Sequence, residues 1–152
     1  MNTIDDIDRR ILRELQRDSA TPLEELGTRI GLSRNACWRR IKALEAAGVI
    51  DRRVALLNPG TLDLGLMVYI QLRTSAHEPG WLEKFSRATN AMPEIMGVYR
   101  MTGDLDYLIR ARVPDMAGYD RLYQRLIARV PLSDVSASFV MEEIKDTHEL
   151  PL

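Results

Sequence analysis

Basic and hydrogen-bonding side chains gather on one side of the stretch from Ser33 to Gly48. The other side of this stretch carries an apolar stripe at helical spacing, formed by Cys37, Ile41 and Leu44. On a helical wheel, four residues point away from that stripe: Asn35, Trp38, Arg39 and Lys42. A helix with such an outer face fits a DNA major groove, where Arg pairs with guanine and Asn with adenine.

Positive charge is concentrated in the same region, although the whole sequence carries a net charge of −1. Residues 1–57 hold eleven Lys or Arg against nine Asp or Glu, whereas residues 58–152 hold ten against thirteen. Because DNA binding depends on neutralising phosphates, the basic segment over 34–53 is a candidate contact surface. The residues predicted to contact DNA are Ser33, Arg34, Asn35, Trp38, Arg39, Lys42, Arg52 and Arg53.

Structural interpretations compete with this functional one. The outer residues Trp38 and Arg39 could simply form a solvated helix face. Arg40 falls beside the apolar stripe, so we expect it to pair with an acidic residue of the first helix, such as Asp8. Cys37 could be a thiol sensor, but its place on the buried stripe favours an inert core residue.

Two further helices must position the basic one. Isoleucines and leucines at helical spacing predict a first helix over 4–17. A second helix is expected to begin at Thr21 as N-cap, with Pro22 next and Glu24 completing a capping box, and to end at Gly31. The short connection to Ser33 predicts a helix-turn-helix, with Ser33 as the next N-cap. Residues 49–57 are expected to form a short strand pair, or wing, with Arg52 and Arg53 at its tip.

The pattern changes after the turn signal Asn58-Pro59-Gly60. Alternating residues predict strands over 66–73, 95–102, 105–113 and 135–144, and helical spacing predicts helices over 78–90 and from Pro114. This order is the ferredoxin-like βαββαβ unit. We expect both helices to cover one sheet face and a second subunit to cover the other. The predicted fold class is therefore α+β, with a winged helix-turn-helix domain over 1–57 and a ferredoxin-like domain over 58–152.

Several other classes of protein are disfavoured. No apolar run approaches the roughly 20 residues of a membrane helix, and the N-terminus lacks a signal-peptide core. A single cysteine suits a reducing cytoplasm. His77 and His148 are isolated, so we expect no metal site, and no catalytic set or cofactor motif stands out.

Several motifs resemble those of the Lrp/AsnC (feast/famine) family of bacterial transcription regulators. The motifs are Ile7-Asp8-Arg9-Arg10-Ile11-Leu12, Gly31-Leu32-Ser33, the run over 39–50, Met92-Pro93-Glu94-Ile95 and Thr102-Gly103-Asp104-Leu105-Asp106-Tyr107-Leu108. The Cys37-Trp38 pair and the tail Leu150-Pro151-Leu152 look most like a cysteine-responsive branch. The resemblance covers nearly the whole chain. It implies a DNA-binding regulator, not an enzyme, that forms dimers and octamers and responds to an amino acid such as cysteine or leucine.

The resemblance also implies a place for the effector. In the family, the loop matching Thr102–Asp106 borders a pocket between dimers, whereas the sequence alone would suit a plain hairpin turn. An amino acid needs a carboxylate for its ammonium group, such as Asp104 or Asp106, and N–H donors for its carboxylate, such as those at Gly103. The effector-binding residues expected on this basis are Met101, Thr102, Gly103, Asp104, Asp106, Tyr107, Ser136 and Ser138.

Two other functional classes remain as alternatives to a DNA-binding regulator. One is an enzyme, because siroheme decarboxylases resemble this architecture, but they look to need histidine at the substrate pocket and this chain has none in the strands or the turn loop. The other is a metabolite-binding assembly module without DNA binding. The net charge of +4 over residues 34–53 counts against the assembly module.

Overall fold

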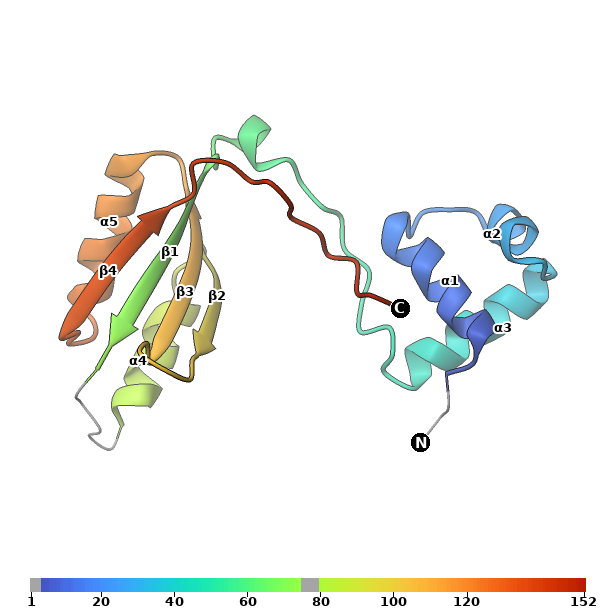
Figure 1. Cartoon of the computed structure of the whole chain (residues 1–152), viewed down its shortest axis with the longest axis horizontal. Helices are drawn as coiled ribbons and strands as arrows, with labels where there is room; N and C mark the ends of the chain where they lie inside the picture. The colour runs from blue at the N-terminus through green and yellow to red at the C-terminus, as the bar shows by residue number, and fades with distance from the viewer. Residues whose placement is uncertain (1–3, 75–79) are drawn as a thin grey trace. The chain divides into compact units, whose positions relative to one another are not determined.

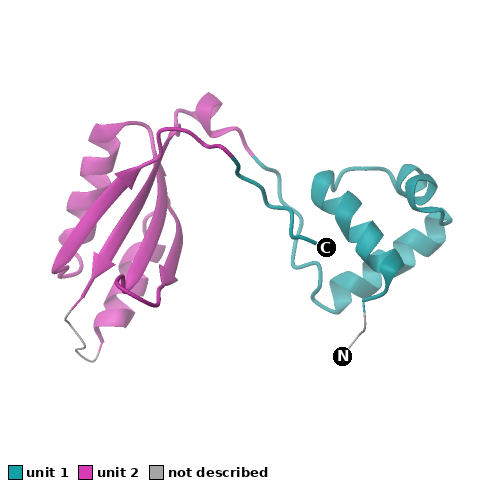
Figure 2. Cartoon of the chain, in the orientation of Figure 1, with its two compact units in different colours: residues 1–56, 145–152 teal, residues 57–144 magenta. Residues whose placement is uncertain are grey.

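The structure is a computed structural model that describes residues 4–74 and 80–152 (Figure 1). The chain divides into two compact units (Figure 2). The first unit contains the chain up to Leu56 together with Lys145–Leu152, and the second unit is Leu57–Ile144. The predicted division into residues 1–57 and 58–152 therefore does not account for residues 145–152, because this tail packs with the first unit.

The described part of the first unit contains three helices: α1 (Asp6–Arg17), α2 (Leu23–Ile30) and α3 (Arg34–Ala46). Their apolar faces meet in one core, to which α3 contributes the predicted stripe. The residues buried in this core are Ile11, Leu12, Leu26, Ile30, Cys37, Ile41 and Leu44. The helix-turn-helix expected from the spacing is confirmed.

The helix ends agree with the sequence in part. The Ser33 hydroxyl accepts the Ala36 N–H at 3.3 Å, and Gly48 adopts the left-handed conformation with φ 70°, both as predicted. The predicted capping box at Thr21 is wrong, because α2 begins after Pro22 without a side-chain cap. A capping box is found instead at α1, where Asp5 accepts the Asp8 N–H at 2.7 Å and Asp8 accepts the Asp5 N–H at 3.3 Å.

The expected wing is not formed. Residues 51–58 contain neither strand nor helix, and all of them are exposed. A strand needs a partner, and the Asp51-Arg52-Arg53 stretch lacks the Gly or Asn that a tight hairpin turn requires. The segment is therefore an extended connection, and the description of this domain as winged is corrected.

The second unit has the predicted βαββαβ order. Its elements are a short 3₁₀ turn η1 (Pro59–Leu62), then β1 (Leu66–Arg73), α4 (Trp81–Asn90), β2 (Ile95–Arg100), β3 (Tyr107–Val113), α5 (Met116–Ile127) and β4 (Asp134–Phe139). The final strand is shorter than expected, since it ends at Phe139 rather than at Ile144. Of the residues expected to begin α4, Glu78 and Pro79 lie outside the described residues.

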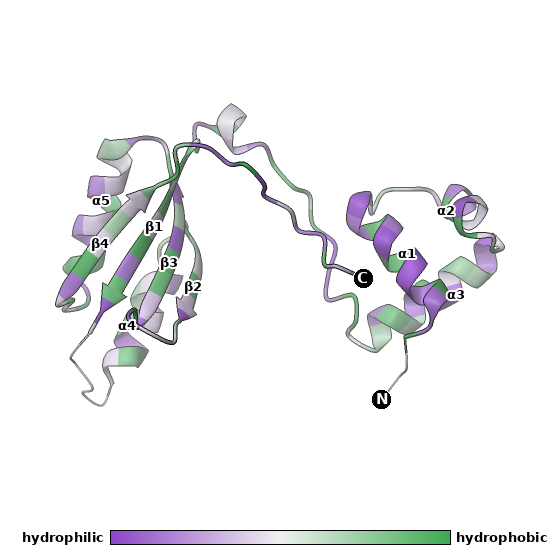
Figure 3. Ribbon diagram, viewed as in Figure 1, coloured by the Kyte–Doolittle hydropathy of each residue, from purple (hydrophilic) through white to green (hydrophobic). Residues whose placement is uncertain are grey.

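The described strands form one antiparallel sheet in the order β2-β3-β1-β4. Apolar residues recur along these strands (Figure 3). Those on one face pack with α4 and α5, for example Ile70 of β1 and Ile109 of β3, which are paired and fully buried. Tyr69, Gln71 and Arg110 lie on the opposite face by strand alternation, and no helix covers that face within the described chain. No described helix is long and apolar enough to span a membrane.

Candidate nucleic-acid interface and effector loop

The outer face of α3 is exposed as the helical wheel predicted. Trp38 keeps 54% of its surface accessible, and Asn35, Arg39 and Lys42 are exposed beside it. Within the described residues, Arg39 has neither an ion pair nor a hydrogen bond to another side chain. An unengaged guanidinium and an unengaged amide on one helix face can both reach base edges.

Other basic residues of the predicted interface are already paired. Arg34 lies 3.0 Å from Glu24 of α2. Lys42 and Arg53 share Glu45, at 2.7 and 3.2 Å, and these two cations lower the pKa of the Glu45 carboxyl, Lys42 more strongly than Arg53. Part of the positive charge of this surface is therefore balanced within the protein.

The two arginines after α3 differ in their attachment. Arg53 also donates to the carbonyl oxygen of Ser19 at 3.3 Å, so its side chain ties the extended segment to the helices. Within the described residues Arg52 pairs only with Asp51, at 3.7 Å, and it keeps 79% of its side chain accessible. Arg52 is therefore the freer of the two to contact phosphate.

An ion-pair cluster fixes α3 against α1. Arg40 lies 2.8 Å from both Asp5 and Asp8, as the sequence predicted for Asp8. The Asp8 N–H and then Arg40 lower the pKa of the Asp5 carboxyl, and the two carboxylates raise the pKa of Arg40. This cluster orients the recognition helix without using its outer face.

Close packing fixes α3 against α2. A side-chain Cβ at Gly27 would lie 2.5 Å from the carbonyl oxygen of Leu32, so only glycine permits this approach. Cys37 packs beside Gly27 and is completely buried, and burial raises the pKa of its thiol. These observations place Cys37 in the core and speak against a reactive sensor thiol.

The loop between β2 and β3 is a tight turn with Gly103 at φ 98°. The Met101 N–H donates to the Asp106 carbonyl at 2.8 Å, and Arg73 Nε donates to the Asp104 carbonyl at 2.8 Å. The two carboxylates of the loop differ. Asp106 accepts the Thr74 N–H at 2.7 Å and so holds the end of β1, whereas the Asp104 side chain is exposed.

The structure separates three other residues of the predicted effector site. Tyr107 is 9% exposed, and its ring packs against Trp81 and Phe85 on the helix-covered face. Ser136 and Ser138 lie on the opposite face of β4, where Ser136 donates to the Gln71 side-chain oxygen at 3.1 Å. Tyr107 is therefore a core residue and does not share a surface with the two serines.

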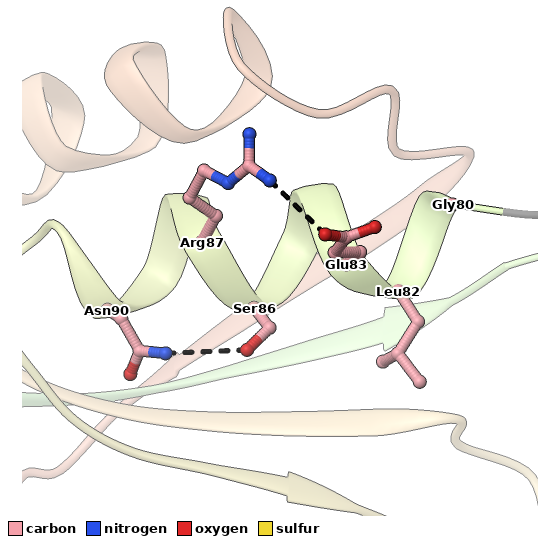
Figure 4. Close-up of a pocket in the computed structure, with 6 residues that line it drawn as sticks. All are labelled: Gly80, Leu82, Glu83, Ser86, Arg87 and Asn90. Carbon is pink, nitrogen blue, oxygen red and sulfur yellow. Dashed lines mark hydrogen bonds and ion pairs between the residues drawn. The ribbon is translucent and has the colours of Figure 1, made fainter.

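Two hollows border α4. One, of about 540 Å³, is lined by residues along this helix (Figure 4): Gly80, Leu82, Glu83, Ser86, Arg87 and Asn90. Its polar side chains are paired with each other, Arg87 with Glu83 and Asn90 with Ser86, each at 3.3 Å.

The other hollow, of about 520 Å³, extends from α4 to the edge strand β2 and reaches Arg100 and Tyr107. Neither hollow includes Thr102, Gly103 or Asp104. The described part of the chain also holds no cluster of three potential metal ligands. His148 is exposed in the tail, and His77 lies outside the described residues.

Two acidic partners and one attachment are not among the contacts predicted from the sequence. Glu45 could have been found, because it follows Lys42 by three residues in a helix. Glu24, predicted to complete a capping box, pairs with Arg34 instead. The attachment of the tail to α1 through Gln16 left no pattern in the sequence.

Both halves of this architecture match known domains. Residues 4–45 match the AsnC-type helix-turn-helix domain, and residues 67–150 match the Lrp/AsnC ligand binding domain. The chain belongs to the Lrp/AsnC family. It is therefore a helix-turn-helix regulator with a ligand-binding domain, as the motifs implied.

Relatives within the Lrp/AsnC family match almost the full chain. The glutamate uptake regulatory protein of Zymomonas mobilis is 48% identical over 149 residues, which cover 98% of this chain and 91% of the relative. The DNA-binding transcriptional activator DecR of Escherichia coli is 43% identical over 150 residues, covering 98% and 99%. A transcriptional regulator from Neisseria meningitidis, solved in complex with L-methionine, has a TM-score of 0.94 at 34% identity, covering 98% and 97%.

Proposed function

We propose that this chain regulates transcription by sequence-specific binding to double-stranded DNA, and that an amino acid controls its DNA affinity or its assembly. The observation that carries the proposal is the outer face of α3, where Asn35, Trp38 and Arg39 are exposed while the opposite stripe is buried. The names of the relatives, which are regulators, support a regulatory rather than an enzymatic role.

The proposed DNA contacts follow from the chemistry of each side chain. Arg39 would bind guanine in a bidentate manner, Asn35 would pair with adenine, and Trp38 would pack on a sugar or a thymine methyl. The phosphate ligands would be Ser33, Arg34, Lys42, Arg52 and Arg53. For Lys42 and Arg53, binding phosphate means giving up part of their interaction with Glu45.

The effector is proposed to bind beside the β2–β3 loop. The exposed Asp104 carboxylate suits an ammonium group, and the backbone around Gly103, with Met101 and Thr102, would face the rest of the ligand. The Neisseria relative, which binds L-methionine, supports an amino-acid ligand. Since the two hollows at α4 leave out Thr102, Gly103 and Asp104, we infer that a second copy of the chain supplies further walls, with Ser136 and Ser138 as candidate contributors.

The proposed regulator works as a homo-oligomer in the cytoplasm, as dimers that assemble further. Two recognition helices on a dimer would reach major grooves about one helical turn apart, so the operators should be roughly palindromic. Genomic DNA captured by the purified protein, with and without an amino-acid pool, would identify those operators by sequencing.

Arg39→Ala tests the DNA-reading role. The variant should lose roughly 1–3 kcal/mol of binding free energy on the operator and much less on random DNA, since a lost base contact affects only the specific site. Arg10→Ala is the matched control, because Arg10 is an exposed arginine of α1 without a partner in the described chain. Equal losses on operator and random DNA would contradict base reading and leave Arg39 as a phosphate ligand.

A further inference from the structure

The end of the chain lies against α1 of the first unit (Figure 2). The Leu150 N–H donates to Gln16 Oε1 at 2.6 Å, and Gln16 Nε2 donates back to the Leu150 carbonyl at 3.2 Å. Arg13 Nε donates to the Leu152 carbonyl oxygen at 2.6 Å. The partners are separated by 134 and 139 positions in the sequence.

These contacts form a specific surface for an extended peptide. Arg13, Gln16 and Arg17 lie three and four positions apart, so they share one side of α1. The Gln16 side-chain amide both accepts from and donates to the backbone of Leu150. A neighbouring β-strand offers an extended backbone the same combination of acceptor and donor. Leu152 adds an apolar anchor, because it is partly buried against the core of the three helices. Glu149 lies 3.8 Å from Arg17 and adds a weak ion pair.

The tail leads from the second unit back to the first, where hydrogen bonds hold it. It follows β4, and the Val140 N–H still donates to the Met67 carbonyl at 3.0 Å, so the chain is attached to the sheet just before it leaves. The other connection begins after α3, where Arg53 holds it to Glu45 and Ser19. The first unit therefore holds the chain both before and after the second unit, through Arg53 on one side and through Gln16 on the other.

We propose that residues 149–152 form a latch on the Arg13–Gln16–Arg17 surface of α1, and that this latch transmits changes at β4 to the helix-turn-helix. The α1 surface is thus a binding site for an extended segment with an apolar end, occupied by the tail of the chain itself. The transmission half rests on the proposed effector function, whereas the latch rests on the contacts alone.

Amide hydrogen exchange of the full chain tests the latch. The Leu150 amide should be protected in the wild type, and in Gln16→Leu it should exchange about tenfold faster, since two hydrogen bonds of ordinary strength are lost. Arg10→Ala removes an arginine of the same helix that makes no contact with the tail in the described chain, and it should leave the rate unchanged. Equal Leu150 rates in the wild type and Gln16→Leu would overturn the latch.

Operator affinity tests the transmission. It is measured with and without L-methionine, leucine or cysteine for the wild type, for Gln16→Leu and for a chain lacking residues 149–152. A wild-type response of the usual allosteric size, about 5- to 150-fold, should fall below about twofold in both variants, while affinity without effector stays within about threefold.

The outcomes separate the two halves of the proposal. An undiminished response in Gln16→Leu, with faster Leu150 exchange, would overturn transmission and leave the latch as a static attachment. A wild type that ignores all three amino acids would overturn the transmission half together with the proposed effectors. The hydrogen-exchange result would still decide whether the latch exists.

Discussion

At the scale of single residues, charge is used to hold α3 in place more than to enlarge its basic face. Arg40 is engaged by Asp5 and Asp8, and Glu45 balances Lys42 and Arg53. Arg39, in contrast, faces outward without such a partner in the described chain. Arg39 is therefore the residue best placed to contact base edges, because its side chain takes no part in the described packing of the helices.

The Asp5 carboxylate should make the stability of the first unit depend on acid pH. Its pKa lies below the usual value of 3.8, because it accepts the Asp8 N–H and faces Arg40. The ionised form is thus favoured in the folded state, so its contribution is present above pH 3.8 and is lost as the pH falls through the lowered pKa. Asp5→Asn, which can still cap the helix, should be less stable than the wild type near neutral pH.

Urea unfolding midpoints measured at several pH values would check this prediction. The difference between Asp5→Asn and the wild type should shrink as the pH falls below 3.8 and through the lowered pKa of Asp5. Asp6→Asn, in the same first turn, controls for the interaction of any carboxylate with the helix dipole. A difference that stays constant through this range would mean that the charge of Asp5 does not matter.

Removing each of the two carboxylates of the β2–β3 loop should have a different effect, one on the effector response and the other on stability. Asp104→Ala should abolish the response of operator affinity to an amino acid while leaving effector-free DNA binding and stability near the wild type, since the contact that Asp104 makes in the described chain uses its backbone carbonyl. Asp106→Ala should instead lower stability by about 1–3 kcal/mol, because the Thr74 N–H loses its acceptor. Thermal unfolding and operator titrations of both variants measure these effects. An Asp104→Ala protein with a full response would remove this carboxylate from the effector site.

At the scale of elements, the turn between α2 and α3 is set by the contact of Gly27 with the Leu32 carbonyl. Replacing glycine by alanine inside a helix normally stabilises it by up to about 1 kcal/mol. Here the sign should reverse, and Gly27→Ala should cost about 1–3 kcal/mol, because the new methyl group would push α3 away.

Thermal unfolding of Gly27→Ala, together with its operator affinity, would check this reversal. Gly65→Ala is the matched control, since a Cβ at Gly65 meets no atom within 4 Å. A Gly27→Ala variant as stable as the wild type would show that the α2–α3 spacing can adjust.

At the scale of the whole molecule, the sheet face without helices should be covered by a second copy. Leu56, Met141 and Ile144 on the connecting segments are also largely exposed, at 66%, 101% and 91%. Light scattering at micromolar concentration should give at least twice the chain mass of 17.3 kDa. Tyr69→Glu, which adds a charge to the middle strand β1, should weaken this association by tenfold or more.

Lys84→Glu, on the exposed side of α4, is the control for the change of charge. It should leave the measured mass unchanged. A wild-type monomer that binds its operator fully would contradict the proposed dimer and the palindromic operators that follow from it.

Local patterns in the sequence were enough to predict the elements and the two faces of α3. Helical spacing placed Cys37, Ile41 and Leu44 inside and Asn35, Trp38 and Arg39 outside, because the direction of a side chain on a helix follows from its position alone. The same local periodicity predicted the βαββαβ order, since strand alternation and helix spacing need no knowledge of distant residues. Arg40 was predicted to pair with α1 because it lies beside the buried stripe.

Which side chains remain available for binding depends on contacts between distant segments of the chain. Asp104 and Asp106 look alike in the sequence, and the Thr74 N–H separates them. Tyr107 looked available to a ligand until the packing of Trp81 and Phe85 placed it in the core. The wing failed to form because a strand needs a partner, and the tail found Gln16 across 134 positions. Such outcomes depend on contacts between distant segments, and local periodicity carries no information about them.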